Sequence, residues 1–247
     1  MTTAPDTMQP RLHLRFPRTL SPLDYFAGAF VFAVSLAVYV KTLAPTVYGE
    51  DSGELIAAAD TLGIPHPTGY PLWCILAKVF MIVVYTGDSA WRANLFSALC
   101  GSAAAMCTAW IICLTTRHRI AAIAASLSLA FSIALWDQSV IAEVYALNAL
   151  ITAACILLLL LGSETRRNIC LYAAGLLFGA GLTNRPVVLL YAPAFAMYVL
   201  AIGGVRFRAW TMHSITLALA FAGLSVYLYL PIRSMADPPM DWGNPET

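Results

Sequence analysis

The sequence predicts an all-α integral membrane protein. Of its 247 residues, 60% are hydrophobic and only 11% are charged, and the mean hydropathy is +0.75. Soluble domains carry about 25% charged residues. The hydrophobic residues also gather in long runs, and a helix crosses a bilayer with about 20 mostly apolar residues. Composition and run length therefore both predict membrane-spanning helices.

Seven runs have the length of a spanning helix, after an N-terminal tail of residues 1–23 that is expected to be cytoplasmic. They fall in a single helical domain, residues 24–247. The predicted spans are residues 24–44, 93–116, 120–136, 144–162, 168–184, 186–205 and 209–232. The closing stretch MADPPMDWGNPET predicts an outer loop, and the natural protein is expected to continue beyond it.

A further run, residues 72–87, is short and carries Lys78 at its centre. A charge facing lipid is costly, so we expect this run to be a re-entrant or interfacial helix in an outer loop of residues 45–92. A short surface helix over residues 52–62 should precede it. This arrangement places the N-terminus and the later basic clusters on the cytoplasmic side, as the positive-inside rule expects. These basic residues are Arg11, Arg15, Arg18, Arg117, Arg119, Arg166, Arg167, Arg206 and Arg208.

Charge and cysteine content exclude several classes of protein. The chain has 14 Lys and Arg against 13 Asp and Glu, so it lacks the basic field that nucleic-acid binding requires. Its six cysteines form no C-x-x-C pair, which argues against a zinc site or a disulfide framework. We interpret them as small packing residues.

The stretch GEDSGELIAAADTLGIPHPTGYPLW, residues 49–73, gathers acids beside the membrane. Asp51 and Glu54 are three residues apart, which places them on one helix face. One interpretation is a capping box, in which Asp51 caps the helix and Glu54 reaches back. The capping-box interpretation gives no role to the neighbouring acid Glu50. His66, between two prolines, either shapes the turn or lines a site.

Other polar residues are predicted on the same outer side. Glu143 starts a span in WDQSVIAEVYALN, Arg185 lies in GLTNRPV, and Arg233 lies in LPIRS. Lys78 and Arg92 are further outer bases that need an anionic partner or an ion pair. The alternative interpretations are that Glu143 is an acid favoured at a helix start and that Arg185 and Arg233 snorkel to the headgroups. Together they favour group transfer from a phosphate-linked lipid donor, with a carboxylate as base and arginines on the phosphate.

Several motifs carry a resemblance to a known family. D-S-G-E-L, H-P-T-G-Y-P-L, A-E-V-Y-A-L, T-N-R-P and P-x-D-W-G-N-P resemble a bacterial membrane family, formerly of unknown function, that is related to an animal transmembrane protein O-mannosyltransferase. More broadly, the chain is similar to the C-type glycosyltransferases, which use polyprenyl-phosphate sugars. The resemblance implies a seven-span core, a catalytic carboxylate at Asp51 and a second acid at Glu143. The chain departs from the family pattern in two places. Its acids run Glu50-Asp51, where Asp-Glu or Asp-x-Asp is commoner, and Thr68 stands where a second proline is usual.

We therefore expect an inverting glycosyltransferase of a bacterial inner membrane. It would move a sugar, mannose by resemblance, from a polyprenyl phosphate to a hydroxyl of a protein or glycan on the extracytoplasmic face. The expected catalytic residues are Asp51, Glu54 and Glu143, and the donor-phosphate residues are Arg185, Arg233, Lys78 and Arg92. The expected lining residues are Glu50, His66, Tyr70, Tyr145, Asn184 and Trp242. A divalent metal is a possible cofactor, and the rival hypotheses are a lipid or solute transporter and a non-catalytic scaffold.

Overall fold

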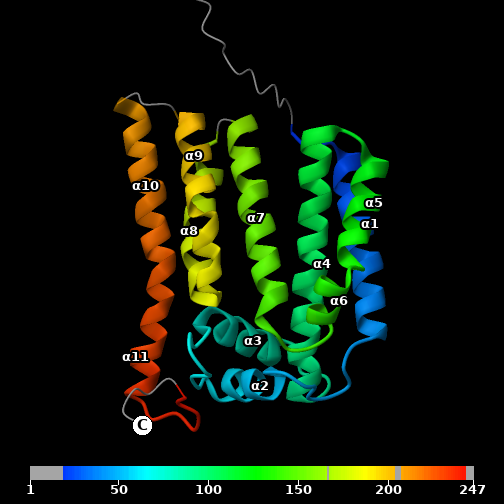
Figure 1. The fold of residues 1–247 in the computed structure, drawn as a ribbon, viewed down its shortest axis with the longest axis vertical. Helices are drawn as coiled ribbons and strands as arrows, with labels where there is room; N and C mark the ends of the chain where they lie inside the picture. The colour runs from blue at the N-terminus through cyan, green and yellow to red at the C-terminus, as the bar shows by residue number, and fades with distance from the viewer. Residues whose placement is uncertain (1–18, 166, 204–206, 243–247) are drawn as a thin grey trace, which may run out of the picture.

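The computed structural model describes residues 19–165, 167–203 and 207–242. Long helices stand side by side, and α2 (Ser52–Thr61) and α3 (Pro71–Val83) lie across one end of them (Figure 1). The long helices are α1 (Pro22–Lys41), α4 (Ser89–Thr116), α5 (Arg119–Ala130), α7 (Val144–Thr165), α8 (Asn168–Asn184), α9 (Ala192–Gly203) and α10 (Phe207–Leu224). The remaining short elements are α6 (Ile133–Ser139), the 3-10 turns η1 (Pro186–Tyr191) and η2 (Ser225–Leu228), and α11 (Tyr229–Ser234).

Some of the residues used to orient the chain lie outside the described residues. They are Arg11, Arg15, Arg18, Arg166 and Arg206, together with residues 243–247 of the closing motif. Of the basic residues expected on the cytoplasmic side, those within the described ranges are Arg117, Arg119, Arg167 and Arg208. Arg117 ends α4 and Arg119 begins α5, at the end of the bundle opposite to α2 and α3 (Figure 1).

Within the described residues, four helical stretches are long and apolar enough to cross a membrane. They are α1, α4, α7 and the stretch Ala209–Ser234, and the pair α5 and α6, bent by 64°, makes a fifth if it is one span. The described helices occupy all the predicted positions, but seven spans are not confirmed. The reason is local: Phe131 and Ser132 break one predicted span, Pro186 begins a 3-10 turn in another, and α8 has only 17 residues. The protein is an integral membrane protein of all-α architecture.

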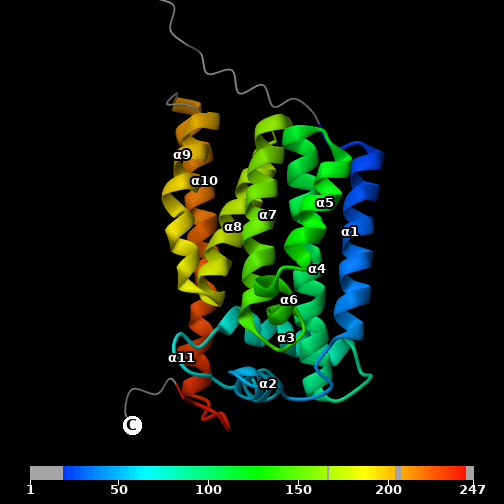
Figure 2. The same cartoon turned by 45° about the vertical axis from the view of Figure 1, so that its right-hand side comes forward.

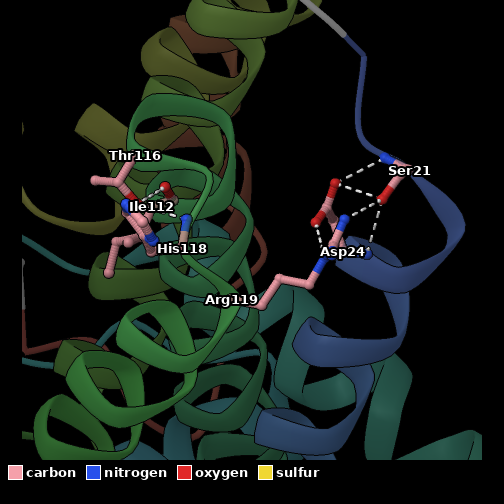
Figure 3. A network of polar contacts seen from close by, with 6 residues as sticks. All are labelled: Ser21, Asp24, Ile112, Thr116, His118 and Arg119. Atoms are coloured by element: carbon pink, nitrogen blue, oxygen red, sulfur yellow. Dashed lines mark hydrogen bonds and ion pairs between the residues drawn. The ribbon is translucent and has the colours of Figure 1, made fainter.

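A polar network fastens the first helix to the bundle. Ser21 and Asp24 form a capping box at the start of α1, with Pro22 in its first turn. Arg119 Nε donates to Asp24 Oδ1 at 2.7 Å, and Arg119 Nη2 donates to Ser21 Oγ at 3.1 Å. Figure 3 shows the three side chains converging from α1 and α5. The network therefore ties together the starts of two helices that are far apart in the sequence.

Small residues bring α8 and α10 close together. A Cβ on Gly179 would lie 1.8 Å from the Ala220 carbonyl oxygen, and one on Gly175 would lie 2.4 Å from that of Thr216. Glycine is needed because any side chain would push the two backbones apart, as in other closely packed membrane helices. This contact fixes α8, whose C-terminal end faces α2 and α3 (Figure 2).

The end of the bundle that carries α2 and α3 is held by hydrogen bonds from buried side chains. Trp73 of α3 donates from Nε1 to the Glu143 carbonyl at 3.1 Å. Asn184 at the end of α8 donates from Nδ2 to the Val144 carbonyl at 3.1 Å, and Asn94 of α4 donates to the Ala44 carbonyl at 2.8 Å. These bonds place the start of α7 and the end of α8 beside the first loop, which is where the predicted site residues lie.

The placement of α3 leads to a topology prediction. Asp88 and Arg117 flank the 28 residues of α4, which separates them by about 40 Å, more than the thickness of a hydrocarbon core. In a cysteine-free background, a cysteine at position 88 is expected to react with an impermeant reagent from outside, and a cysteine at position 117 is not. The opposite pattern would show that α3 crosses the membrane and would reverse the orientation of α4.

Candidate active site

Asp51 and Glu54 do not form the capping box that their spacing allows. Asp51 is the N-cap residue of α2, yet its side chain makes no capping hydrogen bond. The Glu54 carboxylate instead accepts the His66 backbone N–H through Oε1 and lies 3.0 Å from His66 Nδ1 through Oε2. The capping-box interpretation is wrong for this pair. The Asp51 carboxylate is left exposed, with 56% of the side chain accessible.

His66 connects the two acids to Tyr70. Because a carboxylate only accepts hydrogen bonds, the Glu54 contact places a ring proton on Nδ1, so that in the neutral imidazole the lone pair is on Nε2. His66 Nε2 lies 2.9 Å from the Tyr70 hydroxyl and 3.8 Å from Asp51 Oδ2. The loop 62–69 therefore does more than turn the chain, because it carries an imidazole whose orientation is fixed by Glu54.

Glu143 is the buried acid of the site. Only 2% of it is exposed, its Oε2 accepts the Val144 N–H at 3.3 Å, and its Oε1 has no hydrogen-bond partner among the described residues. Burial raises the pKa of Glu143 to about 7, with smaller increases from the charges of Asp51 and Glu50, while the backbone N–H groups of Val144 and Asp51 lower it. The charges of Asp51 and Glu50 act on Glu143 because the first loop covers the start of α7.

Arg185 supplies the positive charge near these acids. Its guanidinium lies over the Tyr145 ring, 4.1 Å from the centroid, a cation–π arrangement that leaves the edge N–H groups pointing sideways. Burial raises the pKa of Tyr70, while Arg185 lowers it and Asp51, Tyr145 and Glu143 raise it. Arg185, Asp51 and Glu143 are therefore all close enough to the Tyr70 hydroxyl for their charges to change its pKa.

The structure therefore gathers most of the predicted site residues at one end of the bundle. The residues brought together are Glu50, Asp51, Glu54, His66, Tyr70, Glu143, Tyr145, Asn184 and Arg185. Sequence reasoning missed Trp73 and Ser97, which are both buried and hold the Glu143 backbone. A tryptophan in a short apolar helix was the one available signal, and its partner lies 70 residues away.

Four other predicted residues make different contacts. Lys78 Nζ binds the Asp60 carboxylate at 3.2 Å as well as the Asp60 carbonyl. Arg92 donates to the Met81 carbonyl at 2.7 Å, near the end of α3, and to the Asp88 carbonyl at 3.1 Å. Arg233 donates to the Leu62 carbonyl at 2.6 Å and the Thr61 carbonyl at 3.3 Å. Trp242 keeps its side chain 59% exposed and bonds Ile64 through its backbone.

Three of the four bases predicted to bind the donor phosphate thus have partners within the protein. Arg233 satisfies carbonyls that the end of α2 leaves unpaired, as basic residues do at helix C-termini. Arg92 does the same at the end of α3, and Lys78 has an ion-pair partner in α2. The common cause is that α2 and α3 end within reach of long basic side chains. Only Arg185 of this group remains next to the acids.

The pKa of Glu143 leads to a stability prediction. It is raised from an ordinary value of 4.5 to about 7, so the folded protein binds this proton more tightly than the unfolded chain does. The associated stability is present below about pH 4.5 and is lost as the pH rises through about 7. Between pH 5 and pH 8 the wild type should lose about 2 to 3 kcal/mol relative to Glu143→Gln. Thermal melts of both proteins in EDTA-containing detergent buffer measure it, and parallel pH dependence would contradict it.

Residues 51–211 match the family described as the Protein O-mannosyl-transferase TMEM260 N-terminal domain. A protein O-mannosyl-transferase TMEM260 of Mus musculus is 32% identical over 229 residues, which cover 88% of this chain and 32% of the relative. The tmem260 protein of Dictyostelium discoideum is 27% identical over 238 residues, covering 88% of this chain and 29% of the relative. No solved structure matches the chain.

The chain thus spans about a third of the length of the curated relatives that it matches. The family match begins at Asp51 and contains Glu54, His66, Glu143 and Arg185. It extends over more than half of the chain and over every residue that the structure gathers at the site except Glu50. The chain belongs to the TMEM260 N-terminal domain family.

Proposed function

We propose that the chain carries the active site of a membrane protein O-mannosyltransferase. The relatives are named protein O-mannosyl-transferases, which supports mannose as the sugar and a protein hydroxyl as the acceptor. The observation that supports catalysis most directly is the Asp51 carboxylate, which is exposed, free of a helix-capping bond and close to His66. A carboxylate in this state is available to accept a proton from a bound hydroxyl.

The proposed donor is a polyprenyl-phosphate sugar. Asp51 takes the proton of a serine or threonine hydroxyl. At the same time, the hydroxyl oxygen of that serine or threonine forms a bond to the anomeric carbon of the sugar. The bond between that carbon and the phosphate oxygen breaks in the same step, and the phosphate leaves with the electron pair. A single displacement inverts the configuration at the sugar. The departing phosphate needs no proton, so one base is enough.

The other residues hold the two substrates. Arg185 lies beside the acids with its guanidinium supported on Tyr145, and its edge N–H groups suit a phosphate oxygen pair. Glu143 and Glu54 border the acceptor side, and His66 and Tyr70 form the wall next to Asp51. In this proposal α2 and α3 lie at the extracytoplasmic surface of a bacterial inner membrane and the N-terminus is cytoplasmic.

The arrangement favours transfer over transport. The gathered acids and Arg185 lie in the loops and helix ends around α2 and α3 (Figure 2). Transporters place their substrate groups near the bilayer midplane, at breaks between repeated helices. A charged cluster at one end is suited to a reaction between a lipid headgroup and an acceptor that arrives from the aqueous side.

Sugar transfer by the full-length protein tests the proposal. The purified protein in nanodiscs is incubated with polyprenyl-phosphate mannose, labelled in the sugar, and a serine- and threonine-rich peptide. We expect labelled peptide whose sugar has the opposite anomeric configuration to the donor, and no label with a free phosphorylated sugar lacking the lipid. Retention of configuration would exclude a single displacement, and absence of transfer with the donor bound would exclude the enzyme hypothesis.

A further inference from the structure

The charge balance of the site is unfavourable for an anionic donor. Glu50, Asp51, Glu54 and Glu143 lie at the site, and among the basic side chains predicted to bind phosphate only Arg185 lies with them. Carboxylates repel a phosphate, and the repulsion grows where water is partly excluded. If the donor is a lipid phosphate, as proposed above, the site needs a further positive charge.

The same residues offer ligands for a divalent cation. Ligand atoms of Asp51, Glu54 and His66 all lie within 4.8 Å of one another. His66 Nε2 and Asp51 Oδ2 are 3.8 Å apart, and two ligands of one cation at about 2.1 Å each lie up to about 4 Å apart. Small side-chain movements are therefore sufficient for both atoms to contact one ion.

Glu54 holds His66 in the orientation that metal binding requires. The Glu54 carboxylate is bonded to the His66 backbone N–H and lies 3.0 Å from Nδ1, so in the neutral imidazole Nε2 carries the lone pair. In metalloproteins the ligating histidine usually gives its other N–H to a carboxylate, which fixes the tautomer and raises the basicity of the ligand. The Tyr70 hydroxyl, 2.9 Å from Nε2, is the contact that an ion would replace.

The buried Glu143 carboxylate beside the cluster offers a further acceptor oxygen. Glu143 is 2% exposed and Asn184 is fully buried, yet Glu143 Oε1 and Asn184 Oδ1 have no hydrogen-bond donor among the described residues. The Glu143 carboxyl is close enough to Asp51 for their charges to interact, and Asn184 bonds the carbonyl of the next residue, Val144. Buried oxygens of this kind normally have a partner, such as a donor, water or a cation.

We infer that Asp51 and His66 bind a divalent first-row cation, with Glu54 as the residue that orients the imidazole. One Asp51 oxygen binds the ion and the other stays available to the acceptor hydroxyl. A mixed carboxylate and imidazole set suits Mn²⁺ or Zn²⁺ better than Ca²⁺, which prefers oxygen ligands alone. The ion would offset the acids and give the donor phosphate a second point of attachment beside Arg185.

Manganese binding tests this site without any measurement of activity. The full-length protein in nanodiscs is titrated with Mn²⁺, and the loss of the free-ion signal is followed by electron paramagnetic resonance. We expect one saturable site per chain in the wild type. Glu54→Gln should weaken it by about 10- to 100-fold, the usual effect of losing an outer-shell carboxylate, and Asp51→Asn and His66→Ala should weaken it at least as much.

Asp60→Asn is the matched control. Asp60 is also an exposed acid of α2, but it pairs with Lys78, so its loss should leave Mn²⁺ affinity unchanged. If His66→Ala does not fold, as judged by melting, Asp51→Asn carries the test, because Asp51 makes no capping bond. The inference is overturned if the folded wild type shows no saturable site, or if Asp51→Asn binds with wild-type affinity.

Sugar transfer, measured separately, distinguishes this inference from the proposed function. Transfer that continues in EDTA, by a protein without a saturable Mn²⁺ site, would overturn the ion site and leave the transferase proposal standing. Stoichiometric Mn²⁺ binding that depends on Asp51, with no sugar transfer, would support the ion site and overturn the transferase proposal.

Discussion

Asp51→Asn is expected to lower sugar transfer by about 100-fold or more while the fold survives. The substitution keeps the size of the side chain but removes the group that accepts a proton, and general-base catalysis is worth about 100- to 10,000-fold. Because Asp51 makes no capping hydrogen bond in the structure, its loss should change stability by only about 0.5 kcal/mol or less. The measurement is transfer of labelled mannose from a polyprenyl phosphate, alongside a melting curve.

Two companion variants sharpen this result. Asp60→Asn makes the same chemical change elsewhere on α2, where the carboxylate pairs with Lys78, and should transfer at close to the parent rate. Glu54→Gln should reduce transfer less than Asp51→Asn, because Glu54 acts through His66. Transfer by Asp51→Asn at the parent rate with donor binding intact would remove Asp51 from the chemistry.

The sequence predicts the all-helical membrane class well because that class depends on bulk composition. Long apolar runs form helices wherever water is excluded, since each backbone polar group must then be satisfied within its own segment. The positions of α1, α4 and α7 therefore follow from run length. The break between α5 and α6 does not, because it depends on Ser132 capping a new helix rather than on hydrophobicity.

The site predictions depend on two kinds of information. The sequence places Asp51, Glu143 and Arg185 next to the ends of predicted spans, and the structure brings these three residues to one end of the bundle. Contacts within hydrogen-bond reach were beyond a single sequence. The spacing of Asp51 and Glu54 indicated a capping box, but the loop 62–69 brings His66 back to Glu54, whose carboxylate contacts the His66 backbone N–H and the imidazole in place of the local cap.

The basic residues also show that side-chain contacts are beyond the reach of a single sequence. In the sequence, Arg185 and Arg233 both follow predicted spans, and both are predicted to bind an anion. The two arginines differ in the groups that lie within reach of each guanidinium. The last carbonyls of α2 lie next to Arg233, whereas Arg185 lies over the Tyr145 ring. Arg233 therefore has a structural role, because it donates to the last carbonyls of α2. The Arg185 guanidinium, which lies over the Tyr145 ring, still has N–H donors for a ligand.

This contrast predicts opposite phenotypes for two alanine substitutions. Arg185→Ala should lower kcat/KM for the polyprenyl-phosphate donor by about 10- to 100-fold, equivalent to about 1.4 to 2.8 kcal/mol, with little change in melting temperature. Arg185→Lys should recover only part of this activity, because an ammonium cannot form the planar two-point contact with phosphate. Arg233→Ala should instead lower stability by about 1 to 3 kcal/mol through the lost bonds to α2.

The folded fraction of Arg233→Ala should keep most of its affinity for the donor, since the removed guanidinium contacts carbonyls and not the phosphate. Donor titrations at a temperature well below both melting transitions separate the two effects. Equal donor kcat/KM values for Arg185→Ala and the parent would remove Arg185 as the phosphate-binding residue. A loss of donor affinity in Arg233→Ala without a loss of stability would return Arg233 to the phosphate, and would require α2 to release it when the donor binds.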